Sequence, residues 1–61
     1  MSCIICRMRW LGGATETPIR GSSYMVGGAA VCAVDVDHVI EALLGGASMK
    51  DILGEAKAGD W

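Results

Sequence analysis

Two short stretches of the chain decide its fold, Cys3-Ile-Ile-Cys6 and Cys32-Ala-Val-Asp35-Val-Asp-His38. The first is a Cys-x-x-Cys pair, whose spacing lets two sulfur atoms reach one ion from a tight turn. In the second, Asp35 and His38 follow the third cysteine at positions that would share one broad face of a helix. Tetrahedral Zn²⁺ takes four ligands and prefers thiolates and imidazoles. The sequence therefore predicts one structural zinc ion per chain, held by Cys3, Cys6, Cys32 and His38, with Asp35 as the alternative fourth ligand.

The length of the chain, 61 residues, is enough for one small domain. A chain of this size hides only about 60% of the surface that its unfolded form exposes, and small folds often need a metal, disulfides or a partner. The length excludes multidomain enzymes, Rossmann folds and solenoids, and leaves little room for a substrate pocket. Because a zinc site closed by four protein ligands is structural rather than catalytic, we expect no enzymatic activity.

The composition points to an ordered chain that keeps some apolar surface. Apolar residues make up 52% and charged residues 20% of the chain, which is too apolar for intrinsic disorder. Residues 1–30 carry a net charge of +2 and residues 31–61 a net charge of −4. Five basic residues are a weak basis for nucleic-acid binding. No stretch has the pattern of a signal peptide or a membrane span, so we expect a cytoplasmic protein whose thiols bind metal rather than form disulfides.

Glycine pairs and a proline divide the first half of the chain into short predicted elements. Residues 7–11 alternate polar and apolar side chains, which favours a short strand. Residues 19–26 are expected to form a second, weak strand, and residues 29–32 either a third strand or the approach to a helix.

The second half carries helical signals. Apolar residues at positions 36, 39, 40, 43 and 44 recur with the helical period, and Asp35 or Asp37 can cap this helix. Gly45-Gly46 ends it, and Ser48 with Asp51 forms a capping box for a second helix that Gly59 ends. We expect a single α+β domain over residues 1–61. A zinc-stapled knuckle and β-hairpin occupy residues 1–34, and a helical hairpin occupies residues 35–58.

This order of elements resembles that of treble-clef and zinc-ribbon fingers. In those proteins a Cys-x-x-Cys knuckle and a β-hairpin precede a helix, whose first turn brings the second ligand pair. The resemblance spans residue 3 to about residue 44, and Asp35 stands where the pattern has Cys or His. It implies a closed structural zinc site. Residues 43–53 also resemble the turn of a helix-turn-helix, with Ala42, Gly46 and Ile52 at the matching spacing.

Two other interpretations of the cysteines stay open. Free cysteine behaves as a small buried hydrophobe, so the three thiols could simply belong to the core. A redox role for Cys3 and Cys6 would normally require a βαβ frame, for which the chain is too short.

Four residues are candidates for contact with a partner: Arg7, Arg9, Trp10 and Trp61. On a strand, the two arginines would project from one side and Trp10 from the other, where it could anchor a protein or stack on RNA. The alternative is a solvated edge strand. Trp61 packs on the helices or is held by a partner.

The function expected from these features is that of a non-enzymatic, zinc-binding interaction module. Such an accessory or adaptor protein would dock onto a larger macromolecular partner. One alternative is a nucleic-acid-binding regulator that uses the helix-turn-helix-like tail or the Arg7/Arg9 strand. The other is a small structural subunit that self-associates or joins a larger assembly.

Overall fold

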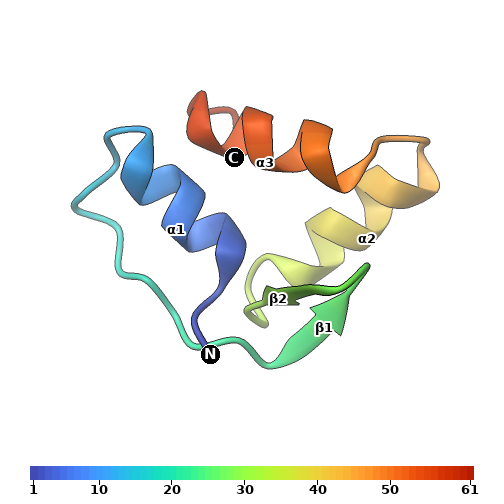
Figure 1. Ribbon diagram of the computed structural model, residues 1–61, viewed down its shortest axis with the longest axis horizontal. Coiled ribbons are helices and arrows are strands. Elements are labelled where there is room, and N and C mark those ends of the chain that lie inside the picture. Colours follow the sequence, from blue (N-terminus) through green and yellow to red (C-terminus); the bar gives the residue numbers. More distant parts are fainter.

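The computed structural model describes all of residues 1–61 as three helices and one antiparallel two-stranded hairpin (Figure 1). The elements follow one another as α1 (Ile4–Leu11), β1 (Tyr24–Val26), β2 (Ala29–Val31), α2 (Val36–Leu44) and α3 (Met49–Lys57). The prediction of a small α+β fold is confirmed. None of the helices has the length and apolar character needed to cross a bilayer.

The N-terminal region differs from the prediction, because residues 7–11 belong to helix α1 and not to a strand. Five alternating residues are too few to distinguish the two-residue period of a strand from the 3.6-residue period of a helix. Arginine, methionine and leucine are also good helix formers. Ile5 is fully buried, and Met8 packs against the same core from the next turn. The helix also separates Arg7, which is exposed, from Arg9, whose side chain is only 14% exposed.

The hairpin turns at Gly27-Gly28, with Val26 opposite Ala29 and Tyr24 opposite Val31. Both glycines have positive φ angles, 56° and 80°, as a two-residue type I′ turn requires. Of the two interpretations of residues 29–32, the structure shows the strand, β2, over Ala29–Val31. The predicted strand at 19–26 was too long, since its first part contributes only an isolated bridge between Ser2 and Gly21.

Both predicted helices of the second half are confirmed, including their ends. The N–H of Asp51 donates to Ser48 Oγ and the N–H of Ser48 donates to Asp51 Oδ2, each at 3.1 Å, which completes the capping box of α3. The helices do not pair closely as a hairpin, because α3 packs chiefly against α1 (Figure 1). Asp35 stands at the N-cap of α2 without forming a capping bond, since its side chain turns toward the cysteines.

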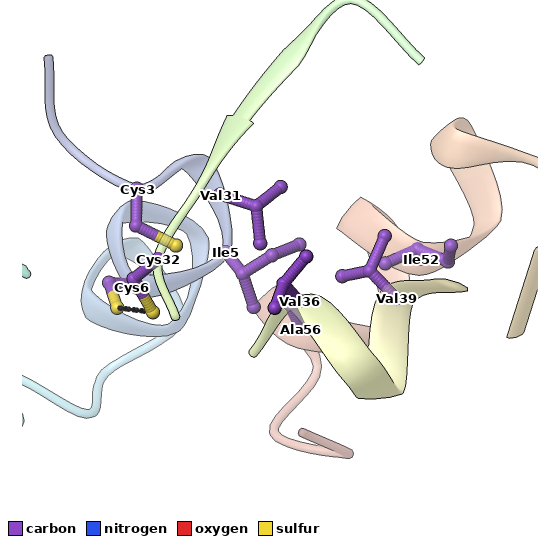
Figure 2. Packing of buried hydrophobic residues seen from close by; sticks show 9 residues of the cluster. All are labelled: Cys3, Ile5, Cys6, Val31, Cys32, Val36, Val39, Ile52 and Ala56. Atoms are coloured by element: carbon purple, nitrogen blue, oxygen red, sulfur yellow. Dashed lines mark hydrogen bonds between the residues drawn. The ribbon is translucent and has the colours of Figure 1, made fainter. Parts of the chain in front are cut away.

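The buried core has a sulfur end and an aliphatic end. Figure 2 shows the three cysteines grouped on one side of Ile5, with Val39 and Ile52 on the other. The nine core side chains are Cys3, Ile5, Cys6, Val31, Cys32, Val36, Val39, Ile52 and Ala56. A core with so few aliphatic side chains provides little hydrophobic stabilisation, so the state of the sulfur end affects the stability of the whole domain.

Gly12, directly after α1, is the glycine where two helices approach without room for a side chain. A Cβ atom there would lie 1.9 Å from the carbonyl oxygen of Lys57, the last residue of α3. We expect Gly12→Ala to lower the free energy of unfolding by about 1–3 kcal/mol, the usual cost of an overpacked contact. Urea denaturation of the variant and the wild type measures this loss.

Gly54, inside α3, is the matched control. Its missing Cβ would meet no atom within 4 Å. Gly54→Ala is therefore expected to raise the free energy of unfolding by about 0.5–1 kcal/mol, because alanine loses less backbone entropy in a helix. Equal effects of the two substitutions would contradict the close approach of α1 and α3.

Candidate metal centre

Cys3, Cys6, Cys32 and Asp35 converge at one end of the core. Their four potential ligand atoms all lie within 4.8 Å of one another. The three cysteines are at most 1% exposed and Asp35 is 6% exposed. Figure 2 shows the three sulfur atoms gathered beside the start of α1. Such a cluster of thiols and a carboxylate can hold a metal ion.

Three elements position the four side chains. Cys3 stands at the N-cap of α1, and Cys6 lies in the first turn of this helix. The N–H of Cys3 donates to the carbonyl of Arg20 at 2.8 Å, which ties the loop before β1 to the cluster. Cys32 follows β2, and its carbonyl accepts the N–H groups of Asp35 and Val36 at 3.2 and 3.1 Å. This turn folds Asp35 back toward the sulfur of Cys32.

The separations of the ligand atoms fit a single tetrahedral ion. Around Zn²⁺, with bonds of about 2.3 Å to sulfur and about 2.1 Å to oxygen, neighbouring ligand atoms lie about 3.6–3.8 Å apart. The sulfur atoms of Cys6 and Cys32 are 3.9 Å apart. Asp35 Oδ2 lies 3.7, 3.6 and 3.2 Å from the sulfur atoms of Cys3, Cys6 and Cys32. These four distances are close to those of a tetrahedral ion, and the remaining sulfur–sulfur separations are at most 4.8 Å.

Asp35 Oδ2 faces more donors than its lone pairs can serve. Three thiols approach it, and Arg9 Nη2 donates to it at 2.5 Å. An ionised carboxylate offers about four lone-pair sites over its two oxygens, so about two belong to this atom. Hydrogen bonding alone therefore leaves part of the cluster unsatisfied, whereas a central cation would use the three sulfurs and the oxygen together.

Two arginines lie beside the cluster. Arg9 Nη2 is 3.6 Å and Arg20 Nη1 is 3.8 Å from the sulfur of Cys6. A divalent ion bound by three thiolates and one carboxylate would leave the site with two negative charges. The two guanidinium groups neutralise that charge inside the protein, where an unpaired charge would be costly.

The environment shifts the acidities of the cluster in different directions. Burial raises the pKa of Cys32 to about 11 and outweighs its backbone hydrogen bonds from Asp35 and Val34. Burial also acts to raise the pKa of Cys6, but hydrogen bonds from the Arg20 backbone and neighbouring side chains outweigh it and lower that pKa. For Asp35, burial is likewise outweighed by hydrogen bonds from Cys32 and Arg9, which lower its pKa. Metal binding would displace the thiol protons, because thiolates are the ligands.

The structure brings the alternative fourth ligand, Asp35, to the cysteines and leaves His38 elsewhere. Helix α2 begins only at Val36, so His38 lies on its exposed surface and not on a helical face shared with Cys32. Its ring stacks on Trp61 with centroids 3.9 Å apart. The Trp61 Nε1–H also donates to Glu55 at 3.4 Å, so this side chain packs on the helices.

The remaining candidate residues separate into two groups. Arg7 and Trp10 are exposed, Trp10 at 44%, whereas Arg9 turns inward to the cluster. The positions of Arg9 and Arg20 beside the sulfur of Cys6 were not predicted from the sequence. Arg9 follows Cys6 by three residues, a helical spacing that would have revealed the pairing had residues 7–11 been assigned to a helix. Nothing in the sequence marks Arg20.

The fold and the cluster together define a small α+β protein with a candidate metal centre. The Cys-x-x-Cys pair lies at the start of a helix that precedes the hairpin. In the zinc fingers that the sequence resembles, the pair lies in a knuckle and not in a helix. No protein-family model matches the chain, and no curated protein or solved structure shows significant similarity to it.

Proposed function

We propose that this protein is a small interaction module stabilised by one structural zinc ion, which Cys3, Cys6, Cys32 and Asp35 hold. The observation that carries the proposal is the convergence of three sulfurs on one carboxylate oxygen, at the separations of a tetrahedral ion. Arg9 and Arg20 support it, because they supply the charge that such a site needs.

Zinc fits the donor set better than other common ions. Three thiolates are soft ligands, which favour zinc, copper(I) and iron–sulfur clusters over magnesium or calcium. Zinc also accepts a carboxylate in a tetrahedral shell. The separations of the four atoms suit one ion at their centre.

A structural role follows from the closure of the site. Four protein ligands complete a tetrahedral shell and leave no position for water or substrate, whereas catalytic zinc keeps one position open. The ligands are also buried, so a substrate has no direct path to the ion. We therefore propose a non-enzymatic protein.

The interaction role is supported by apolar side chains that the small core leaves outside. Leu11 is 62% exposed, Met25 62% and Leu44 84%. Exposed apolar side chains in a chain this short favour docking onto a larger partner. The nucleic-acid alternative has less support, because Arg9 is paired with Asp35 and is not free to contact phosphates.

Native mass spectrometry of the purified full chain tests the proposal. We expect one zinc ion per chain, displaced together with loss of helical circular dichroism when a strong chelator is added. A chain that carries no metal and stays folded would contradict the zinc site and leave a network of buried thiols.

A further inference from the structure

A groove lies between helix α1 and strand β2, on a part of the surface that the metal cluster does not use. The cavity has a volume of about 580 Å³, within the range of about 300–1,000 Å³ common for ligand sites. Ile4 and Arg7, three residues apart on α1, form one wall. Gly28, Ala29 and Ala30 form the other, and Met1 and Ser2 complete the lining.

The strand wall of the groove is the outer edge of β2. Gly28 belongs to the turn, and Ala29 and Ala30 are the β2 residues that line the cavity. Because alternate side chains of a strand point to opposite faces, two neighbouring strand residues line the cavity along an edge and not on one face. No residue of β1 lines it. The wall consists of glycine and alanine, whose small side chains let another backbone approach closely.

Backbone groups on this edge are free to pair. The type I′ turn makes Val26 and Ala29 a hydrogen-bonded pair, so the next pair, Met25 and Ala30, exchanges no hydrogen bonds. The N–H and C=O of Ala30 therefore point away from β1, toward the groove. An exposed edge of this kind accepts an added strand.

Arg7 sets the charge of the groove. It carries the charged side chain among the residues that line the cavity, and it is exposed. Arg9 forms the ion pair with Asp35, and Arg7 forms none. A guanidinium beside an unpaired strand edge complements a peptide that carries a carboxylate.

We propose that this groove binds an extended acidic segment of a partner protein, which adds as a strand along β2 and pairs one Asp or Glu side chain with Arg7. This inference rests on the interaction role proposed above and names the partner by its chemistry. Main-chain hydrogen bonds to Ala30 would provide affinity, and Arg7 would select the acidic side chain.

Two matched substitutions isolate the strand edge. Ala30→Pro removes the N–H that points into the groove and leaves the hydrogen-bonded pairs of the hairpin intact. Met25→Pro removes the corresponding N–H on the opposite edge and serves as its control. Arg7→Glu reverses the charge of the groove, and Lys50→Glu, at an exposed position of α3, controls for the change in net charge. Circular dichroism establishes that each variant is folded, and Arg7→Glu, at an exposed position, tests the proposal independently of the proline variants.

The probe is a bead-bound library of random eight-residue peptides, acetylated at the N-terminus and attached through the C-terminus, so that no terminal carboxylate is free. The labelled full chain, of measured zinc content, is screened against it, and enriched peptides are resynthesised for fluorescence anisotropy. We expect enriched peptides to share an Asp or Glu. Arg7→Glu and Ala30→Pro should each weaken binding about tenfold, the loss of roughly one hydrogen bond or charge pair. Met25→Pro and Lys50→Glu should leave it nearly unchanged. A peptide with Lys in place of the acidic residue should regain binding to Arg7→Glu.

Several results would contradict the proposal that the groove binds an acidic segment. These are no enrichment, enrichment without acidic residues, and binding that survives both groove substitutions. A dimer in solution that Ala30→Pro dissociates would also overturn it, because a second copy would then occupy the edge. The zinc measurement separates this failure from that of the proposed function. If the chain contains zinc and binds peptides at another place, the interaction role stands and only the groove proposal is wrong. If the chain is folded without metal, the proposed zinc site is wrong.

Discussion

Cys32→Ser is expected to abolish stoichiometric zinc binding and to leave the chain largely unfolded, as chelation should do to the wild type. Structural zinc contributes an apparent binding free energy of about 10–16 kcal/mol in small zinc domains at neutral pH. This contribution is as large as the whole free energy of unfolding of an ordinary domain, about 5–15 kcal/mol. The aliphatic part of this core consists of six side chains, so we expect that it cannot replace a contribution of that size. Far-ultraviolet circular dichroism and zinc content, measured on the same samples, check the prediction.

Val31→Ala is the matched control, since Val31 precedes Cys32 and is equally buried without being a candidate ligand. It should cost about 2 kcal/mol through the lost methyl groups and the cavity left behind, and it should keep one zinc ion per chain. If Cys32→Ser and Val31→Ala behave alike, and chelator has no effect on either, the cysteines are core residues and not ligands.

Asp35→Ala and His38→Ala are expected to separate the two candidates for the fourth ligand. Loss of residues that merely support a metal ligand lowers affinity about 10–100-fold, so loss of the ligand itself should exceed about 100-fold. Asp35→Ala also leaves Arg9 without its partner, and a broken buried ion pair costs about 3–5 kcal/mol. His38→Ala removes only the stack on Trp61, worth about 0.5–1.5 kcal/mol, and leaves the zinc affinity unchanged.

Competition with a chromophoric chelator measures these zinc affinities. Asp35→Cys provides a positive control, because a fourth thiolate in the same place should keep the site closed. The assignment of Asp35 is wrong if His38→Ala loses zinc while Asp35→Ala retains it.

Helix α1 connects the two proposals. Cys6 faces the sulfur cluster, whereas Ile4 and Arg7 line the groove. An ion held by Cys3 and Cys6 would fix the start of this helix, and with it one wall of the groove.

The helices of the second half and most of the candidate ligands can be predicted from the amino-acid sequence. Helices α2 and α3 were predictable because their apolar period, their glycine ends and the Ser48–Asp51 capping box are local signals that agree with one another. The Cys-x-x-Cys spacing and the third cysteine indicated a metal site for the same local reason. Gly27-Gly28 was predicted only as a break between elements, and the structure shows that both residues have the positive φ angles of a hairpin turn.

The first helix, the position of the fourth candidate ligand and the groove depend on how the chain packs. Residues 7–11 fit either a strand or a helix, and burial of Ile5 beside the aliphatic core favours the helix. Asp35 and His38 are both at plausible spacings from Cys32. Because α2 starts only at Val36, the turn before the helix places Asp35 beside the sulfurs, whereas His38 lies on the helix and stacks on Trp61. The contacts of Arg9 and Arg20 with Cys6 join residues from different elements, and no local period can encode a pairing that exists only when the chain is packed.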